Sequence, residues 1–168
     1  MRWIALPALL SSVLIVACGG GSMKTTTPST TKGEPPRSRD DFIEVADAVC
    51  RNHQSRREDL ESQAGELGAL TSREKARRVA VLLRKESANR RAEVAELRSL
   101  QPPPTDRPAV DEILSLIGAE TRVIDRWADA YDAGNPAAIR RLQIRLGVTG
   151  ERATVRARAF GFEVCGQH

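Results

Sequence analysis

The chain has 168 residues, with 26 lysines and arginines against 22 aspartates and glutamates, and a formal charge of +4. The positive excess lies before residue 40, because the residues from Asp40 to His168 contain 21 basic and 21 acidic side chains. A nucleic-acid-binding domain concentrates basic side chains on its folded part, so this distribution argues against a DNA or RNA partner.

The first 17 residues are typical of a secretory signal peptide. Arg2 is the only charged side chain in them, and the 15 residues from Trp3 to Ala17 are apolar apart from two serines. As a helix this run would rise about 22 Å, which is short of a hydrocarbon core of about 30 Å, and Pro7 disfavours a spanning helix further. A basic start, a short apolar run and a small residue at its end predict export and cleavage.

The apolar run ends in Ile15-Val16-Ala17-Cys18, which resembles the lipobox of bacterial prolipoproteins. The resemblance implies that residues 1–17 are removed and that Cys18 becomes a lipidated first residue carrying a diacylglyceryl group. Such a group would hold the chain on the outer face of the cytoplasmic membrane or elsewhere in the bacterial envelope, since two acyl chains bind a membrane stably. The alternative is an ordinary secreted protein in which Cys18 carries no lipid.

Residues 18–39 are predicted to be a flexible linker behind the lipid. The stretch from Gly19 to Ser38 consists mainly of glycine, serine, threonine and proline. Such a composition buries too little apolar surface to order itself.

Residues 40–168 are predicted to form one all-α domain, because apolar residues recur at three- and four-residue spacing. No run alternates between apolar and polar residues over a length that would indicate a β-strand. Three prolines, Pro102 to Pro104, separate the second helix from the third. Asp106 is expected to cap the third helix, and Asn135 with Pro136 to begin the fourth. The expected helices are 40–66, 72–100, 106–133 and 136–160.

The short connections favour an antiparallel, up-down-up-down four-helix bundle. The net charges of the four helices are −5, +5, −4 and +5 in chain order. In a square bundle every helix then lies beside two helices of opposite charge, and this disfavours other helix orders.

Cys50 and Cys165 are predicted to close the bundle with a disulfide, because an even pair in an exported chain usually bridges. A glycine at position 161 is expected to end the fourth helix and turn the chain back toward Cys50. A redox or metal pair is the alternative. Cys50 and His53 share a helix face as half of a metal site would, but no second such pair accompanies them, and no metal is expected.

Four polar residues are predicted to lie at one level of the bundle and to line a pocket for a small ligand: His53, Arg90, Glu120 and Thr121. In this hypothesis His53 and Glu120 titrate while Arg90 holds an anionic group through two hydrogen bonds. The alternative is a layer of satisfied hydrogen bonds and ion pairs.

No catalytic residue is predicted, because the chain has no nucleophile elbow, zinc-protease helix or phosphate-binding glycine loop. The expected protein is a membrane-anchored extracytoplasmic lipoprotein with no cofactor beyond the lipid on Cys18. Its expected role is a non-catalytic binding or scaffolding module for an envelope protein, glycan or lipid. The alternative is a small-ligand carrier that uses the polar mid-bundle pocket.

Overall fold

The computed structural model describes residues 38–69 and 72–165, with only the backbone of residues 68 and 69. The chain divides into two units, Met1–Lys32 and Gly33–His168, and all described residues belong to the second. They form four α-helices, one short 3-10 helix and no strand, which confirms the all-α prediction for this part of the chain. The predicted signal peptide, Cys18 and the linker up to residue 37 lie outside the described residues.

The helices begin and end within one residue of their predicted bounds. They are α1 (Arg39–Gly65), α2 (Ser72–Ser99), α3 (Arg107–Asp132) and α4 (Pro136–Phe160), and the unpredicted 3-10 helix η1 (Glu66–Ala69) follows α1. Helix α1 begins one residue inside the predicted linker.

Local side-chain bonds explain where the helices begin and end. Ser38 and Asp41 form a capping box at the start of α1. The side chain of Asn135 accepts the Ala138 N–H at 3.0 Å as predicted, and Gly161 ends α4 with a φ of 114°. Asp106 occupies the predicted N-cap position of α3, but its side chain makes no capping bond, and its Oδ1 instead lies 3.4 Å from Nε of Arg39.

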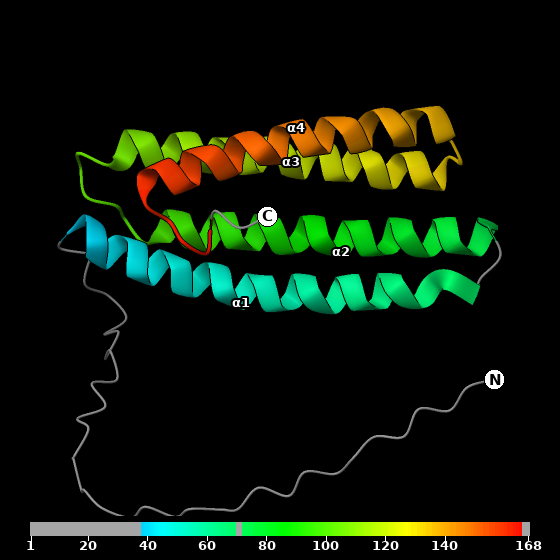
Figure 1. Cartoon of the computed structure of the whole chain (residues 1–168), viewed down its shortest axis with the longest axis horizontal. Coiled ribbons are helices and arrows are strands. Elements are labelled where there is room, and N and C mark those ends of the chain that lie inside the picture. The colour runs from blue at the N-terminus through cyan, green and yellow to red at the C-terminus, as the bar shows by residue number, and fades with distance from the viewer. Residues whose placement is uncertain (1–37, 70–71, 166–168) are drawn as a thin grey trace, which may run out of the picture. The chain divides into compact units, whose positions relative to one another are not determined.

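Successive helices lie side by side, as Figure 1 shows. Helix α1 packs against α2, α2 against α3, and α3 against α4. Each of these pairs joins helices of opposite net charge. No Cα atom of α1, however, lies within 8 Å of a Cα atom of α4. The square expected from the charges is therefore open along the side between α1 and α4.

The apolar core lies at the end of the domain where α1 begins and α4 ends. There the Phe42 ring of α1 contacts the rings of Phe160 and Phe162, with centroids 6.3 and 6.1 Å apart. Side chains thus join α1 to the end of α4 although the two backbones stay apart. The core residues are Phe42, Ala46, Cys50, Val94, Leu97, Val110, Ile113, Leu114, Ile117, Ala153, Ala157, Phe160, Phe162 and Cys165.

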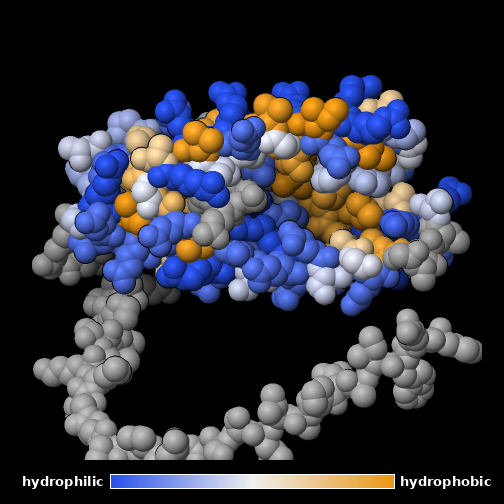
Figure 2. Space-filling model, viewed as in Figure 1, coloured by the Kyte–Doolittle hydropathy of each residue, from blue (hydrophilic) through white to orange (hydrophobic). Residues whose placement is uncertain are grey.

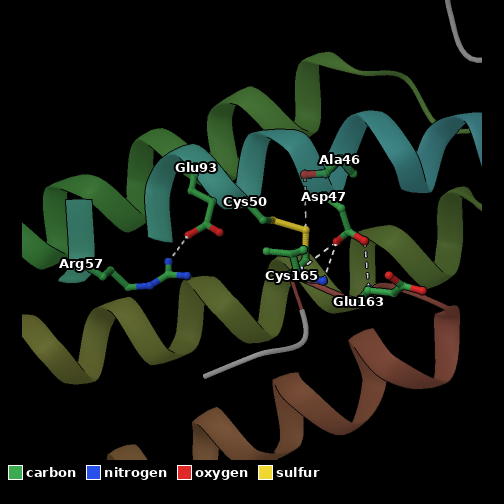
Figure 3. Close-up of a disulfide and its surroundings, with 8 residues drawn as sticks. Ala46, Asp47, Cys50, Arg57, Glu93, Glu163 and Cys165 are labelled. Carbon is green, nitrogen blue, oxygen red and sulfur yellow. Dashed lines mark hydrogen bonds and ion pairs between the residues drawn. A yellow bond between two sulfur atoms is a disulfide. The ribbon is translucent and has the colours of Figure 1, made fainter. Parts of the chain in front are cut away.

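The residues after α4, Gly161 to Cys165, form a C-terminal clip that crosses back to α1. The predicted Cys50–Cys165 disulfide is present and joins positions separated by 115 residues. Beside it, the buried carboxylate of Asp47 accepts the backbone N–H groups of Glu163, Val164 and Cys165 at 2.9, 3.0 and 3.0 Å (Figure 3). Three donors that would otherwise be buried or half-buried without partners are satisfied by one side chain.

Replacing Asp47 by alanine is expected to destabilise the domain by about 2 kcal/mol, because it leaves these N–H groups without their acceptor. Urea unfolding with the disulfide intact measures the change. Glu44→Ala, one turn earlier on α1 and exposed, is the matched control and should change little. Equal unfolding midpoints for the two variants would contradict the role assigned to Asp47.

Candidate functional site

The side on which α1 and α4 diverge contains a cleft, which we call the α1–α4 cleft. Its volume is about 420 Å³, within the range of about 300–1,000 Å³ typical of small-molecule sites. Figure 2 shows it as a hollow with apolar walls in the half of the domain where α1 ends and α4 begins. All four helices line it, through Arg57, Leu60, Glu61, Ala64, Val79, Leu82, Leu83, Glu86, Arg90, Glu120, Ile124, Trp127 and Leu146.

Large apolar side chains form most of the surface of the cleft. Ile124 is buried, but the others are only half-buried, because the diverging helices leave them without a facing helix. Their sequence spacing is that of a bundle core, and the core residues at the opposite end of the domain are nearly fully buried. We call this set the apolar wall: Leu60, Val79, Leu82, Leu83, Ile124, Trp127 and Leu146.

Charged side chains lie where the cleft meets the middle of the bundle. Nη1 of Arg57 lies 3.1 Å from Oε2 of Glu93 (Figure 3). Arg90 contacts two carboxylates, with Nε 2.8 Å from Oε1 of Glu86 and Nη2 3.5 Å from Oε1 of Glu120. We call these five residues the ionic cluster. It contains three carboxylates and two guanidinium groups.

Several buried polar atoms of the residues that line the cleft have no hydrogen-bond partner. Five buried side-chain atoms of the described residues share this property, and four of them belong to residues that line the cleft. A buried polar atom without a partner costs about 1–3 kcal/mol, so their concentration at one place marks the cleft as a site with polar binding capacity. The four are Nη2 of Arg57, Oε2 of Glu86, Oε2 of Glu120 and Nε1 of Trp127.

The surroundings of Glu120 and Arg90 shift both of their pKa values upward. Burial raises the pKa of Glu120, and the attraction of Arg90 only partly opposes this. Burial by itself lowers the pKa of Arg90, but the negative charges of Glu120, Glu86 and Glu93 outweigh it and raise the pKa above its usual value. Arg90 therefore stays charged, whereas Glu120 binds a proton more readily than an ordinary glutamate.

Two of the four predicted ligand-binding residues line the cleft, and two do not. Arg90 and Glu120 both line it. His53 is fully buried between α1 and α2: its Nδ1 lies 2.7 Å from Oδ1 of Asn89, whose amide nitrogen donates to the His53 carbonyl at 3.0 Å. Asn89 Oδ1 is thus an acceptor, so His53 Nδ1 donates. Thr121 donates its hydroxyl to the Ile117 carbonyl at 2.9 Å, within α3.

Sequence reasoning missed Arg57 and Trp127 as lining residues. Arg57 follows His53 by four residues and so shares its helix face, which is a signal that was present in the sequence. Trp127 belongs to the most regular apolar stripe of the chain, and such a stripe predicts a core position. Only the divergence of α1 and α4 exposes it to the cleft.

No metal site or membrane-spanning helix is found among the described residues. Cys50 is bonded to Cys165 and supplies no thiolate, which excludes it as a metal ligand beside His53. No group of three histidine, cysteine, aspartate or glutamate side chains in residues 38–69 and 72–165 is placed to hold a metal ion. No helix in these ranges is both long enough and apolar enough to cross a bilayer.

Comparisons with known proteins do not assign the chain to a family. The chain matches no protein-family model, and no curated protein or solved structure is significantly similar to it. The function is therefore inferred from the residues and their geometry.

Glutamine in place of Glu120 is expected to stabilise the domain at neutral pH. A carboxyl group whose pKa is raised by folding contributes stability at low pH that is lost as the pH rises through the raised value. Glutamine does not titrate, so the E120Q protein should unfold at higher urea concentration than the natural protein near pH 7. The difference should shrink as the pH falls through the raised pKa toward the ordinary value of 4.5, and it should be absent below that value. The exposed E61Q variant should match the natural protein throughout. A difference between E120Q and the natural protein that is independent of pH would contradict this assignment.

Proposed function

We propose that this chain is an exported lipoprotein whose helical domain is a non-catalytic binding module for a small amphiphilic ligand. The domain, residues 40–168, is in this proposal an antiparallel up-down-up-down bundle that opens between α1 and α4. The observation that carries the proposal is the α1–α4 cleft, which combines an apolar wall with four buried polar atoms that lack partners. Sites for small ligands typically combine an apolar lining with a few polar groups that fix orientation.

The lining favours binding over catalysis. Neither a histidine nor a cysteine is among the residues that line the cleft, and Glu86 and Glu120 lie against Arg90. A hydroxyl or thiol nucleophile with an adjacent histidine, which is a common arrangement in covalent catalysis, does not occur in this set.

The proposed location rests on the lipobox-like sequence that ends at Cys18. The disulfide supports export, because such bonds persist mainly in oxidising compartments. A linker of about 20 residues would let the domain reach up to about 65 Å from its lipid.

Scaffolding is a second candidate, and exposed aliphatic residues on α4 favour it. Ile144, Val148 and Val155 are 72%, 55% and 59% exposed, and spacings of four and seven residues place them on one face of the helix. Helix α4 carries six arginines and one glutamate, so a protein partner on this face would be acidic.

The lipid anchor is tested by mass spectrometry of the protein recovered from bacterial membranes. The mature chain should begin at Cys18 and carry a diacylglyceryl group. Replacing Cys18 by alanine should remove the added mass and move the protein out of the membrane fraction. An unmodified Cys18, or a different first residue, would refute the anchor.

Ligand binding in the cleft is tested with N-phenylnaphthylamine, a neutral dye whose fluorescence rises in apolar surroundings. The full-length W3F variant leaves Trp127 as the single tryptophan, so quenching of its emission reports binding at the cleft. Leu83→Glu places a charge in the apolar wall and should weaken dye binding about tenfold or more, since burying a leucine contributes about 1.5–3 kcal/mol.

Val81→Glu is the matched control, because Val81 lies on the same helix and is 50% exposed. It should bind the dye as the natural protein does. Equal binding by the two variants, or the absence of saturable binding to any of them, would refute the cleft as a ligand site.

A further inference from the structure

The ionic cluster carries one negative charge more than its two guanidinium groups neutralise. Glu93 faces Arg57 at 3.1 Å and Glu86 faces Arg90 at 2.8 Å. Glu120 is the third carboxylate, and it meets Arg90 only at 3.5 Å. Because Glu120 is 5% exposed, its charge is poorly hydrated, and an unbalanced buried charge is costly.

The unpartnered oxygens belong to the same carboxylates. Glu86 and Glu120 line the cleft, and the Oε2 atom of each is buried and accepts no hydrogen bond. Both guanidinium groups, in contrast, already face carboxylates. An anionic ligand group would compete with those carboxylates, whereas a cationic donor would meet two acceptors that lack a partner.

Two donors of the lining residues also lack partners, but they do not change the preference for a cationic ligand group. Nη2 of Arg57 and Nε1 of Trp127 also lack acceptors, and they suit a carbonyl or hydroxyl oxygen of the ligand. Neither can compensate the excess negative charge. The net charge of the cluster therefore decides the sign of the ligand's charged group.

We propose that the α1–α4 cleft selects an amphiphile with a protonated amine, whose N–H groups donate to Glu120 and Glu86 while its apolar body lies on the apolar wall. This inference rests on the proposed function and names its ligand class. The bond is a charge-assisted hydrogen bond, which is about twice as strong as a neutral one.

The protonation state of Glu120 should also affect the affinity for the amine. The charged groups around Glu120 are Arg57 on α1 and Glu86, Arg90 and Glu93 on α2. On α4, the uncharged Gly150 lies beside it: a Cβ added to Gly150 would lie 3.4 Å from Oε1 of Glu120. Burial raises the pKa of Glu120, and a bound ammonium lowers it again. Affinity for the amine should therefore fall as the pH drops through that raised value.

The test compares three probes with the same tail and different heads: decylammonium, decanol and decyl sulfate, each below its micellar concentration. Each is titrated into the full-length W3F protein, and the emission of Trp127 is followed. Decylammonium should bind about tenfold more tightly than decanol, and decyl sulfate most weakly. The variant E120Q should lose about tenfold in affinity for decylammonium and keep its affinity for decanol.

Two further variants keep the result interpretable. The D59N variant removes an exposed carboxylate of α1 that does not line the cleft and should change the decylammonium affinity less than twofold. The E86Q variant should weaken decylammonium binding as E120Q does. The same loss in two independent variants would not be explained by a folding defect in one of them.

Equal affinities for the three probes, or equal losses for decylammonium and decanol in E120Q, would overturn the choice of an amine while leaving a neutral binding cleft in place. Failure of all three probes to bind would overturn the proposed function together with this inference.

Discussion

The attachment of the C-terminal clip to α1 determines how the rest of the domain is arranged. Among the other α-helices, α1 has close backbone contacts only with α2. Its position relative to α4 therefore depends on the contact of Phe42 with Phe160, on the disulfide and on the bonds to Asp47. In the chain-entropy model, a bridge across a loop of about a hundred residues contributes nominally about 4.7 kcal/mol. This attachment acts at one end of the bundle. Toward the other end α1 and α4 diverge, and the cleft is the result.

The ionic cluster separates the closed end of the bundle from the open one. Moving charged groups out of water costs several kcal/mol for each ion, and an apolar layer of similar volume is often at least as stable. Three glutamates sharing two arginines are therefore a poor arrangement for stability. The cluster is better explained by its position at the cleft, where Glu86 and Glu120, each with one unpartnered oxygen, lie beside the apolar wall.

Local features of the sequence predicted the helices and the disulfide well. Capping residues such as Asn135 and the stop at Gly161 are local signals, and their bonds form within a few residues. Counting residues outward from the predicted loops also placed Arg90 and Glu120 at one level, and the structure brings them into contact. His53 lies near that level, but its side chain turns into the interface between α1 and α2.

The sequence did not predict the opening between α1 and α4. The spacing of Leu82 and Leu83 is that of buried core residues, and no local signal distinguishes them from the core at the other end. Whether a helix covers them depends on tertiary packing. The role of Asp47 could not be predicted from the sequence either, because its partners are backbone N–H groups more than a hundred residues away.

The position of the disulfide also fixes the order in which the domain reaches its final form. Cys165 follows α4, so a ribosome must complete all four helices before Cys50 has its final disulfide partner. Until Cys165 has been synthesised, the Cys50 thiol therefore stays open to mixed disulfides, and formation of the Cys50–Cys165 bond is a late step of maturation. A cell that exports this protein would need its thiol oxidants to act after the whole domain has emerged.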